Sequence, residues 1–524
     1  MKDRRYKLTK ACEDSFRQIL QRPSKDGEIQ AHHVASFQAH MRHIVDVMYP
    51  SQYFTGEVLS FGSDDGNQLG LCTDPEAEKE DEYVPSLIPP QNLPSYNVKA
   101  IAAGGSSSFA LTYDGTVYSW GVNDEGQLGR GDIPSEQLHT IGKVPLDDTI
   151  IQVSAGNTHT LFLDMDGTVF VAGQYYTQEY GKWMDRNTLQ ELEQAQKEGK
   201  PNLLPYQLTT FSQKVIKVAA GNNFSAALLE DGCTLVTWGL AMDGQLARSR
   251  SGGAPPVDAP KDGQQHRSFD YEKPMLGEYK NVFDDKKKTN VQVFETKNDM
   301  VFKNFLTPKA VDWEDSLNRT VRRHIVDFAC GDRHLLVVAR DDGSFETRVY
   351  SAGFNVGGQL GQGDLEPCHF LSPIRFLDKK RICKVATGLH HSLALNMLGD
   401  NVWAWGNSNN SSLGLGPEDA PRPVPTPQLV SFPKSIQGER IVDISAGDST
   451  NFVITDKYNI YSWGFNVNGQ AGINSDVMDI VERPRKFDPM ETVQRRYNPE
   501  ATKGWVLQVA AGGQHTLLLV KRFK

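Results

Sequence analysis

The chain carries two short glycine signatures that alternate along its length, each in seven copies. The first is an Ala-Gly or similar step followed by a small polar run and an apolar strand, and its glycines are Gly104, Gly156, Gly221, Gly331, Gly388, Gly447 and Gly512. The second is an aromatic-Gly or similar step that leads into a Gly-Gln-Leu-Gly-like turn, and its glycines are Gly62, Gly121, Gly173, Gly239, Gly353, Gly406 and Gly464. Such repeats predict an array of small units, because one unit cannot bury its own apolar face.

Turn residues between the two signatures predict a hairpin in each unit. The clearest turns are Asp114-Gly115, Asp166-Gly167, Asp231-Gly232 and Asp342-Gly343. Asp-Gly between apolar runs indicates a hairpin turn with positive φ at both central residues, so we expect Ser108–Leu111 to pair with Val117–Trp120. The pitch of about 52 to 66 residues suits a four-stranded sheet, as in a propeller blade. Helical solenoids need apolar residues at 3.6-residue spacing, which these units lack.

The two ends of the chain predict a closed ring. The repeat region opens with the second half of a unit at Gly56–Gly62 and finishes with a first half at Gly512–Leu519. Pairing these halves completes a seventh blade and removes a raw edge strand. We therefore predict an all-β fold, a seven-bladed β-propeller over residues 53–524 that is closed by pairing of its N- and C-terminal strands.

The composition excludes several classes of protein. The chain has 524 residues and a net charge of −10, which makes its surface a poor partner for nucleic acid. No apolar run approaches the length of a membrane span, and the N-terminus lacks the apolar region of a secretory signal. The six cysteines have no paired spacing, so we expect reduced core residues and neither disulfides nor a zinc site. We expect a monomer without cofactor or metal.

Residues 1–52 lie before the first signature and have a helical pattern. Apolar residues recur along one stripe at Val34, Phe37, Met41, Ile44 and Met48. We expect a short helical N-terminal extension that covers the rim or bottom of the propeller, with a partner-binding helix as the alternative. His40 and His43 lie one helical turn apart, but no carboxylate or cysteine completes a metal site.

The interval between Gly239 and Gly353 is about twice the normal pitch. Because no first signature falls between Gly239 and Gly331, we predict an irregular insertion at about 247–312 and no eighth blade. Its glycine, proline and charge content is too high for an independent core. Arg248, Arg250 and the lysines at 286–288 are candidates for binding an acidic partner, and a solvated loop is the alternative.

A second irregularity follows Gly173, where the Gly-Gln-Leu-Gly turn is missing. The replacement residues are Gln174, Tyr175, Tyr176, Thr177, Gln178, Glu179, Tyr180, Gly181, Lys182 and Trp183. Loops carry function on rigid scaffolds, and aromatic side chains are typical of contact surfaces. The segment therefore indicates a protruding contact loop, with simple degeneration of the turn as the alternative.

The signatures resemble those of the regulator of chromosome condensation family. The resemblance rests on Ala155-Gly156-Asn157-Thr158-His159-Thr160 and on the run from Trp120 to Gly129, and it covers about residues 56–524. The founding member of that family is a nuclear guanine-nucleotide exchange factor for the small GTPase Ran. That factor has an irregular wedge in the third blade, a long irregular connection after the fourth and a Gly-Gly-Gln-His-Thr end strand. This chain has all three in the same order, ending at Gly512–Thr516.

The resemblance implies an exchange factor that does no covalent chemistry. Such a factor binds the nucleotide-free GTPase more tightly than the loaded form, so it accelerates nucleotide release. Residues 174–183 would be the wedge that presses on the phosphate-binding region of the GTPase. The blade-top contacts implied by the resemblance are Asn157, Asn223, Asp332, His390, Asp448 and His515. The family commonly has aspartate where this chain has Asn157 and Asn223, so Asp332 and Asp448 are the candidates to supply charge.

Four histidines recur at one repeat position: His159, His334, His391 and His515. A repeat position predicts a buried residue bonded to a neighbouring blade. His390 breaks this register because it precedes the repeat histidine, so it is the better candidate for a functional group.

A second hypothesis is a chromatin- or histone-binding or scaffold propeller without exchange activity. In the family the irregular connection contacts histones, and Arg248 and Arg250 are the corresponding residues here. The expected location is the nucleus, or otherwise the cytoplasm, because the basic residues near the start are too sparse for a convincing nuclear signal. A phosphate-binding loop is excluded, because Gly104–Ser108 lacks the required lysine. No carboxylate pair or metal cluster indicates an enzyme in the channel.

Overall fold

The computed structural model describes residues 54–71, 82–89, 91–93, 97–131, 140–173, 204–208, 210–239, 243–248, 277–284, 289–296, 308–314, 322–417, 422–474, 478–491 and 505–523. The chain divides into two units, Met1–Gln52 and Tyr53–Lys524, and the first, with its expected helix, lies outside the described residues. Within the described part of the chain, no helix is long and apolar enough to span a membrane.

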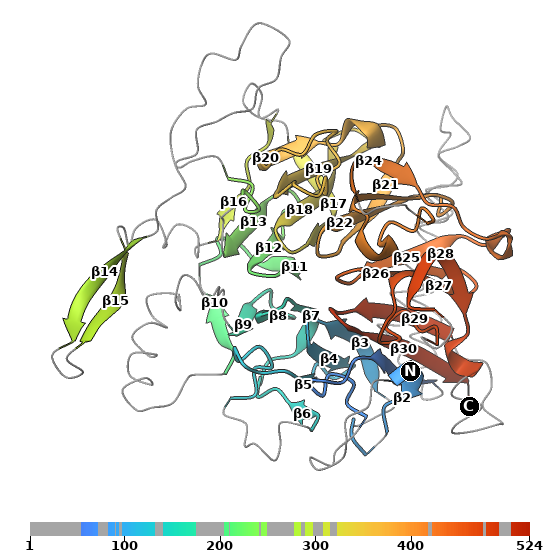
Figure 1. The fold of residues 1–524 in the computed structure, drawn as a ribbon, viewed down its shortest axis with the longest axis horizontal. Helices are drawn as coiled ribbons and strands as arrows, with labels where there is room; N and C mark the ends of the chain where they lie inside the picture. The colour runs from blue at the N-terminus through green and yellow to red at the C-terminus, as the bar shows by residue number, and fades with distance from the viewer. Residues whose placement is uncertain are drawn as a thin grey trace, which may run out of the picture. The chain divides into compact units, whose positions relative to one another are not determined.

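The second unit contains seven four-stranded antiparallel sheets, the blades of the predicted propeller (Figure 1). Blades are numbered here from the one that holds the N-terminal strand, and strands run from the channel outward. Blade 1 consists of β29 (Trp505–Ala511), β30 (His515–Phe523), β1 (Phe54–Gly62) and β2 (Glu82–Leu87). Blade 2 consists of β3 (Val98–Ala103), β4 (Ser107–Thr112), β5 (Val117–Gly121) and β6 (Gly142–Lys143). Blade 3 consists of β7 (Ile150–Ala155), β8 (His159–Asp164), β9 (Val169–Gly173) and β10 (Tyr206–Leu208).

The fourth blade takes its outer strand from the far end of the insertion. Blade 4 consists of β11 (Val215–Ala220), β12 (Phe224–Leu229), β13 (Leu235–Gly239) and β16 (Lys309–Ala310). Blade 5 consists of β17 (Arg323–Cys330), β18 (His334–Asp341), β19 (Thr347–Gly353) and β20 (Cys368–Pro373). Blade 6 consists of β21 (Ile382–Thr387), β22 (His391–Asn396), β23 (Val402–Asn407) and β24 (Pro423–Leu429). Blade 7 consists of β25 (Ile441–Ala446), β26 (Thr450–Thr455), β27 (Ile460–Phe465) and β28 (Ile480–Phe487). Three 3-10 turns complete the described structure: η3 (Arg375–Leu377), η4 (Asn409–Ser411) and η5 (Lys434–Ile436).

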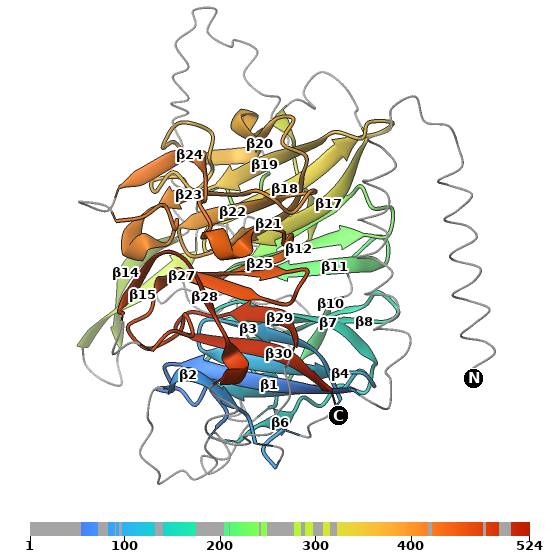
Figure 2. The ribbon, with the colours of Figure 1, turned by 90° about the vertical axis from the view of Figure 1, so that its right-hand side faces the viewer.

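The ring closes as the sequence predicts, and Figure 2 shows the same sheets from the side. The inner strand of each blade contacts the inner strand of the next, and β29 of blade 1 contacts β3 of blade 2. In blade 1, β1 pairs with β30 along its whole length, with Val58 opposite Leu519 and Leu59 opposite Leu518. These four side chains are at most 3 % exposed. The N- and C-terminal strands therefore share one buried sheet, which leaves the ring without a seam.

The residues that recur in the repeat form hydrogen bonds within their own turn and contacts with the neighbouring blade. In the turn after the aromatic-Gly step, Asn355 Oδ1 accepts a bond from the Leu360 amide at 2.9 Å, and Leu360 is fully buried. The buried Trp405 donates from Nε1 to the Gln359 carbonyl of the preceding blade at 2.9 Å. The Asn-x-x-Gly-Gln-Leu turn therefore fixes its own shape and also anchors the next tryptophan.

The predicted hairpins form, but their turns differ from the expected type. Ser108 pairs with Trp120 and Leu111 with Val117, as predicted. Gly115 has a φ of 86°, whereas Asp114 does not have positive φ. The Gly115 amide donates to the Thr112 carbonyl at 3.1 Å, which makes a three-residue loop of a type I turn followed by a left-handed glycine. The expectation of positive φ at both residues was wrong, because the third loop residue relieves the strain that a two-residue loop would place on the aspartate.

The insertion lies inside blade 4, between β13 and β16. Its described part holds one two-stranded hairpin, β14 (Gly277–Asp284) with β15 (Thr289–Thr296). The Asp312 amide donates to the Ala247 carbonyl at 2.7 Å, so the two ends of the insertion are joined at a narrow neck.

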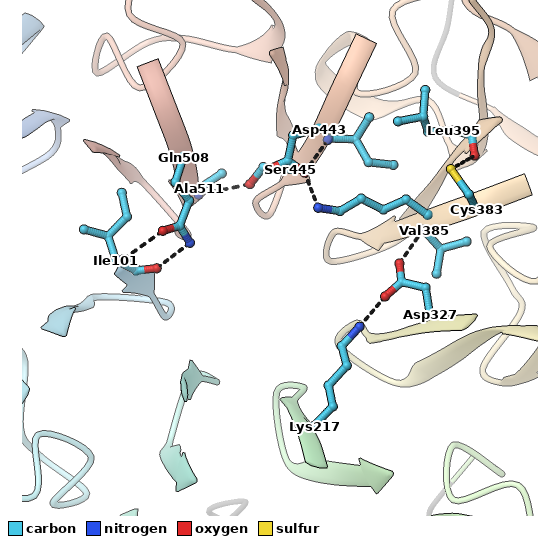
Figure 3. A network of polar contacts seen from close by, with 12 residues as sticks. Ile101, Lys217, Asp327, Cys383, Val385, Leu395, Asp443, Ser445, Gln508 and Ala511 are labelled. Atoms are coloured by element: carbon cyan, nitrogen blue, oxygen red, sulfur yellow. Dashed lines mark hydrogen bonds and ion pairs between the residues drawn. The ribbon is translucent and has the colours of Figure 1, made fainter. Parts of the chain in front are cut away.

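Inter-blade contacts near the middle of the inner strands hold the ring from within the channel (Figure 3). Lys217 of blade 4 pairs with Asp327 of blade 5, and the other Asp327 oxygen accepts a bond from the Val385 amide of blade 6 at 2.9 Å. Lys384 of blade 6 pairs with Asp443 of blade 7. Each of these groups is partly or fully removed from water, and each charge has an opposite partner, as a buried charge requires.

Candidate functional site

The seven first-signature glycines form a closed ring at one mouth of the channel, called here the glycine ring. A methyl group on Gly156 would lie 2.1 Å from the Gly221 carbonyl oxygen of the next blade. On Gly512 it would lie 2.6 Å from the Gly104 oxygen, which completes the circle. Only glycine allows the blades to approach so closely. The ring surrounds a cavity of about 150 Å³.

The residue after each ring glycine decides the chemistry of this mouth. Four blades place a polar side chain there: Asn157, Asn222, Asp332 and Asp448. The other three blades have Gly105, Leu389 and Gly513 at this step. The polar side chains therefore come together on the rim of one small opening.

Asp332 belongs to a network that links blades 4 and 5. Asn222 Nδ2 donates to Asp332 Oδ1, and Arg333 Nε lies 3.2 Å from Asp332 Oδ2. Arg333 also lies 3.2 Å from Asp243 Oδ2 through its NH1, and its guanidinium stacks over Phe354 at 4.3 Å from the ring centroid. Asp332 is thus held by two donors, and its side chain is 8 % exposed.

Asp448 has a different environment on the rim, two blades further along than Asp332. Burial, with the nearby charge of Asp332 as a smaller cause, raises the pKa of Asp448 to about 6. Among the described residues that these contacts link, Asp332, Asp448 and Asp243 lie near one cation, Arg333. The local charge at neutral pH is therefore negative, and a basic group from a partner would relieve the desolvation of Asp448.

His390 lies beside this network, with its ring 6.4 Å from Phe354. Burial is the main cause that lowers the pKa of His390. The charge of Asp332 acts in the opposite direction, and the charge of Arg333 lowers this pKa further. The imidazole is therefore neutral at pH 7, with one nitrogen as donor and one as acceptor.

A second, shallower cavity of about 480 Å³ opens at the same mouth over blades 1 to 3. Its polar lining includes Asp65, Gln68, Gln127, Asn157 and Gln514, and it shares Asp448 with the rim. Hydrogen-bonding groups therefore extend from the glycine ring outward across several blades.

The predicted site residues do not all lie at the mouth of the channel. Asn157, Asp332, His390 and Asp448 lie at the mouth, as expected from the repeat. Asn223 lies one residue beyond the rim position, where its Oδ1 accepts a bond from Thr158 Oγ1 at 3.1 Å. Gln174–Trp183 and Arg250 lie outside the described residues.

The repeat histidines are buried between blades, as the sequence analysis expects. His515 is 1 % exposed, and its Nε2 lies 2.8 Å from Ser108 Oγ of blade 2. His334 makes the same contact with Ser392 at 3.0 Å. His515 is therefore inaccessible to a partner, and its place among the blade-top candidates has to be withdrawn.

Arg248 also has a place inside the fold. It lies at the neck of the insertion, where burial lowers its pKa to about 10, opposed by the charge of Asp312. An arginine that is partly buried in this way offers an acidic partner less guanidinium surface than a fully exposed arginine would.

Sequence reasoning missed Asn222, Asp243, Arg333 and Phe354. The signal for Asn222 was present, because it follows Gly221 as directly as Asn157 follows Gly156. Asp243 follows β13 of blade 4, and the packing of blade 4 against blade 5 brings it to Arg333, whereas Phe354 follows β19 of the same blade as Arg333 and donates its amide to the Arg333 carbonyl at 2.8 Å. Among the described residues, no group of three or more His, Cys, Asp or Glu side chains is placed to hold a metal ion.

Comparisons with known proteins agree with this architecture. The human Regulator of chromosome condensation is 28 % identical over 472 residues, which cover 89 % of this chain and 91 % of that protein. The Ultraviolet-B receptor UVR8 of Arabidopsis thaliana is 26 % identical over 430 residues, 80 % of this chain and 75 % of the receptor. The crystal structure of Prp20p from Saccharomyces cerevisiae superposes with a TM-score of 0.65 at 20 % identity, over 92 % of this chain and 95 % of that one. The family model described as the RCC1-like domain matches residues 57–518, so the chain belongs to the RCC1-like domain family.

Proposed function

We propose that this protein is a guanine-nucleotide exchange factor for a Ran-type small GTPase. The observation that carries the proposal is the negatively charged rim of the glycine ring, where Asp332, Asp448, Asn157 and His390 come together. The similarity to the human Regulator of chromosome condensation extends over nearly the full length of both chains, which supports a shared role. UVR8 is named as a receptor, so membership of the family alone does not assign the role.

The rim suits a basic partner surface. Asp332 is held in place by Asn222 and Arg333, so it offers its charge without a further cost of ordering. Asp448 has raised pKa because of burial and a like charge, and a lysine or arginine of the GTPase would stabilise its ionised form. The two asparagines at 157 and 222 add neutral hydrogen-bonding groups between them.

Residues 174–183 are the proposed wedge. They follow directly from β9, whose last residue Gly173 pairs with His159 three residues beyond the ring glycine Gly156. The last residue of β9 therefore lies at the same mouth as the charged rim, which supports the proposal. Binding of the nucleotide-free GTPase by both the rim and the wedge lowers nucleotide affinity by the same free energy, because the coupling is reciprocal.

Nucleotide release tests the proposal. Ran loaded with a fluorescent GDP analogue is mixed with the full-length protein and excess GDP, and we expect release well above the intrinsic rate. Replacing residues 174–183 by a plain Gly-Gln-Leu-Gly turn should abolish most of the acceleration. Asp448→Ala should reduce it about tenfold to a hundredfold, the range for loss of a charged contact of about 1.5 to 3 kcal/mol.

Met165→Ser is the matched control, since Met165 is 69 % exposed on a hairpin turn at the other end of the blades. Release at the intrinsic rate with the unaltered protein would contradict the proposal.

The alternative is a nuclear propeller that binds histones or serves as a scaffold without exchange activity. The Prp20p structure was described together with its binding to Gsp1p and histones, which keeps this alternative open. Binding of nucleosomes without any acceleration of release would favour it. The buried position of Arg248 weakens the histone contact inferred from the sequence.

A further inference from the structure

A one-residue bulge occurs near the start of every inner strand. In blade 4 the register shifts between Val215 and Lys217, which leaves Ile216 unpaired, and in blade 7 it shifts between Ile441 and Asp443 around Val442. The seven bulged residues are Lys99, Ile151, Ile216, Val326, Cys383, Val442 and Leu507. We call these seven residues the basal ring, and six of them are apolar.

The basal ring surrounds the mouth opposite the glycine ring. Each bulged residue lies five positions before the ring glycine of its blade, as in Ile216 and Gly221 or Val442 and Gly447. At about 3.3 Å per residue, the two rings are about 16 Å apart along the channel. A partner at the basal ring would therefore leave the charged rim accessible.

Four aliphatic members of the basal ring are exposed to solvent. The exposed fractions are 39 % for Ile151, 49 % for Ile216, 40 % for Val326 and 50 % for Val442. Single exposed aliphatic residues are ordinary, but four at equivalent positions around one opening bring exposed apolar surface to the same mouth, and apolar surface gathered in this way marks an interaction site.

Basic side chains border this apolar surface on four consecutive blades. In blades 2 to 7 the residue after the second strand donates its amide to the carbonyl of the residue before the inner strand, and in blades 4 to 7 this acceptor residue is basic. These residues are Lys214, Arg322, Arg381 and Arg440, which we call the basic arc. All four are exposed. Blades 2 and 3 have Asn97 and Thr149 at the same place, so the arc covers one side of the mouth.

Two of the nearby carboxylates are engaged in their own turns, and a third, Asp342, lies 3.3 Å from His324 Nε2. Asp231 Oδ1 accepts bonds from the amides of Cys233 at 2.9 Å and Thr234 at 2.8 Å. Asp456 Oδ1 accepts a bond from the backbone amide of Arg440 at 3.1 Å. Within the described residues, neither Lys214 nor Arg440 forms a side-chain ion pair. The charges of these two residues are thus available beside the exposed aliphatic side chains.

We propose that the basal ring over blades 4 to 7 is a docking site for an acidic amphipathic segment of a partner protein. Apolar side chains of the segment would pack on Ile216, Val326 and Val442, and its carboxylates would face the basic arc. An apolar core with a charged border is the usual anatomy of a protein interface, and a segment with one apolar face is a common way to fill it.

A displayed library of random 16-residue peptides, selected against the full-length protein, tests this assignment. We expect binders that combine aliphatic or aromatic residues with Asp and Glu, and that weaken as salt rises. The double variant Ile216→Asp/Val442→Asp should weaken their binding at least tenfold, and Arg440→Ser should weaken it severalfold.

The matched control is Val356→Asp/Val467→Asp, two residues with exposed fractions of 58 % and 44 % in the turns at the glycine-ring end. This variant should bind the same peptides as the unaltered protein. Urea midpoints close to that of the unaltered protein establish that the basal-ring variants are folded.

Four results would overturn the proposal. The first is that the library yields basic peptides or no binders, and the second is that the selected peptides bind the Ile216→Asp/Val442→Asp variant as tightly as the unaltered protein. The third is that the protein binds no peptide but binds phosphatidylserine vesicles through the basal ring. The fourth is that the protein sediments as a dimer that the same variant dissociates. Nucleotide release should be the same with and without the Ile216→Asp/Val442→Asp substitutions, so the outcome here is separate from that of the exchange assay.

Discussion

Asp448→Asn should stabilise the protein near neutral pH, because the native fold disfavours the ionised form of this carboxyl. Its pKa is about 6 in the fold, against an ordinary value of 3.8. Between these two pH values the folded state binds more protons than the unfolded state, so stability falls as pH rises through this window. A displacement of this size corresponds to about 3 kcal/mol above pH 7, taken as an order of magnitude. Asparagine carries no charge and removes this cost.

Urea unfolding measured from pH 4 to pH 8 checks this prediction. Trp120, Trp238, Trp405 and Trp463 are fully buried and give a fluorescence signal for unfolding. The advantage of Asp448→Asn should be small at pH 4 and should grow to about 1 to 3 kcal/mol above pH 7. An advantage that does not change with pH, or a variant that is less stable at pH 7.5, would refute the reasoning.

Asp332→Asn is the matched comparison on the same rim. Asp332 accepts bonds from Asn222 and Arg333, so its removal weakens a formed network and should lower stability. The same change removes a like charge from the neighbourhood of Asp448 and should lower the pKa of Asp448. Opposite effects of two aspartates on one rim would indicate that Asp448 is kept for binding at the expense of stability.

Three further substitutions test how the ring is held together. Gly156→Ala should cost about 3 kcal/mol or more, because its methyl would lie 2.1 Å from a backbone carbonyl oxygen. The methyl of Gly343→Ala would meet nothing within 4 Å, so this control should cost only about 1 to 2 kcal/mol for its positive φ. Urea midpoints compare the stabilities of the two variants. Asp327→Ala should lower stability by about 1 to 3 kcal/mol, since it removes the partner of Lys217, whose side chain is 35 % exposed, and the acceptor of the Val385 amide. His334→Phe should cost about 1 to 2 kcal/mol above pH 7 through one lost buried hydrogen bond. Burial lowers the pKa of His334 from 6.5 to about 3, so below pH 6.5 the unfolded state binds a proton that the folded state does not, and the cost should shrink as pH falls towards 5 in the same unfolding assay.

Much of the fold follows from short stretches of sequence. The number of blades and the closure of the ring could be read from the order of the two glycine signatures, because each signature is stabilised within its own turn or hairpin. Asn355 bonding to the amide of Leu360 is an example in which donor and acceptor are five residues apart. Hydrogen bonds between residues so close in the sequence can form again in every repeat that has the same residues.

The contents of the site depended on contacts between blades. The sequence placed Asp332 and Asp448 at equivalent steps of two repeats, but it did not show that their charges interact across the channel. It assigned Asn223 to the rim, where the structure has Asn222, because the two asparagines are adjacent in the turn between β11 and β12 and their side chains make different contacts, Asn222 with Asp332 and Asn223 with Thr158.

Burial decided the remaining roles. His515 and Arg248 are polar residues that the sequence offered as contacts, and the ring encloses the first between blades and the second at the neck of the insertion. The basal ring consists of bulged residues whose exposure no local pattern predicts. The sequence by itself thus determined the repeat unit and its number, since those depend on hydrogen bonds and turns a few residues long. The tertiary structure decided which side chains meet, which are enclosed and which face solvent, since these depend on neighbours that are 50 or more residues away along the chain.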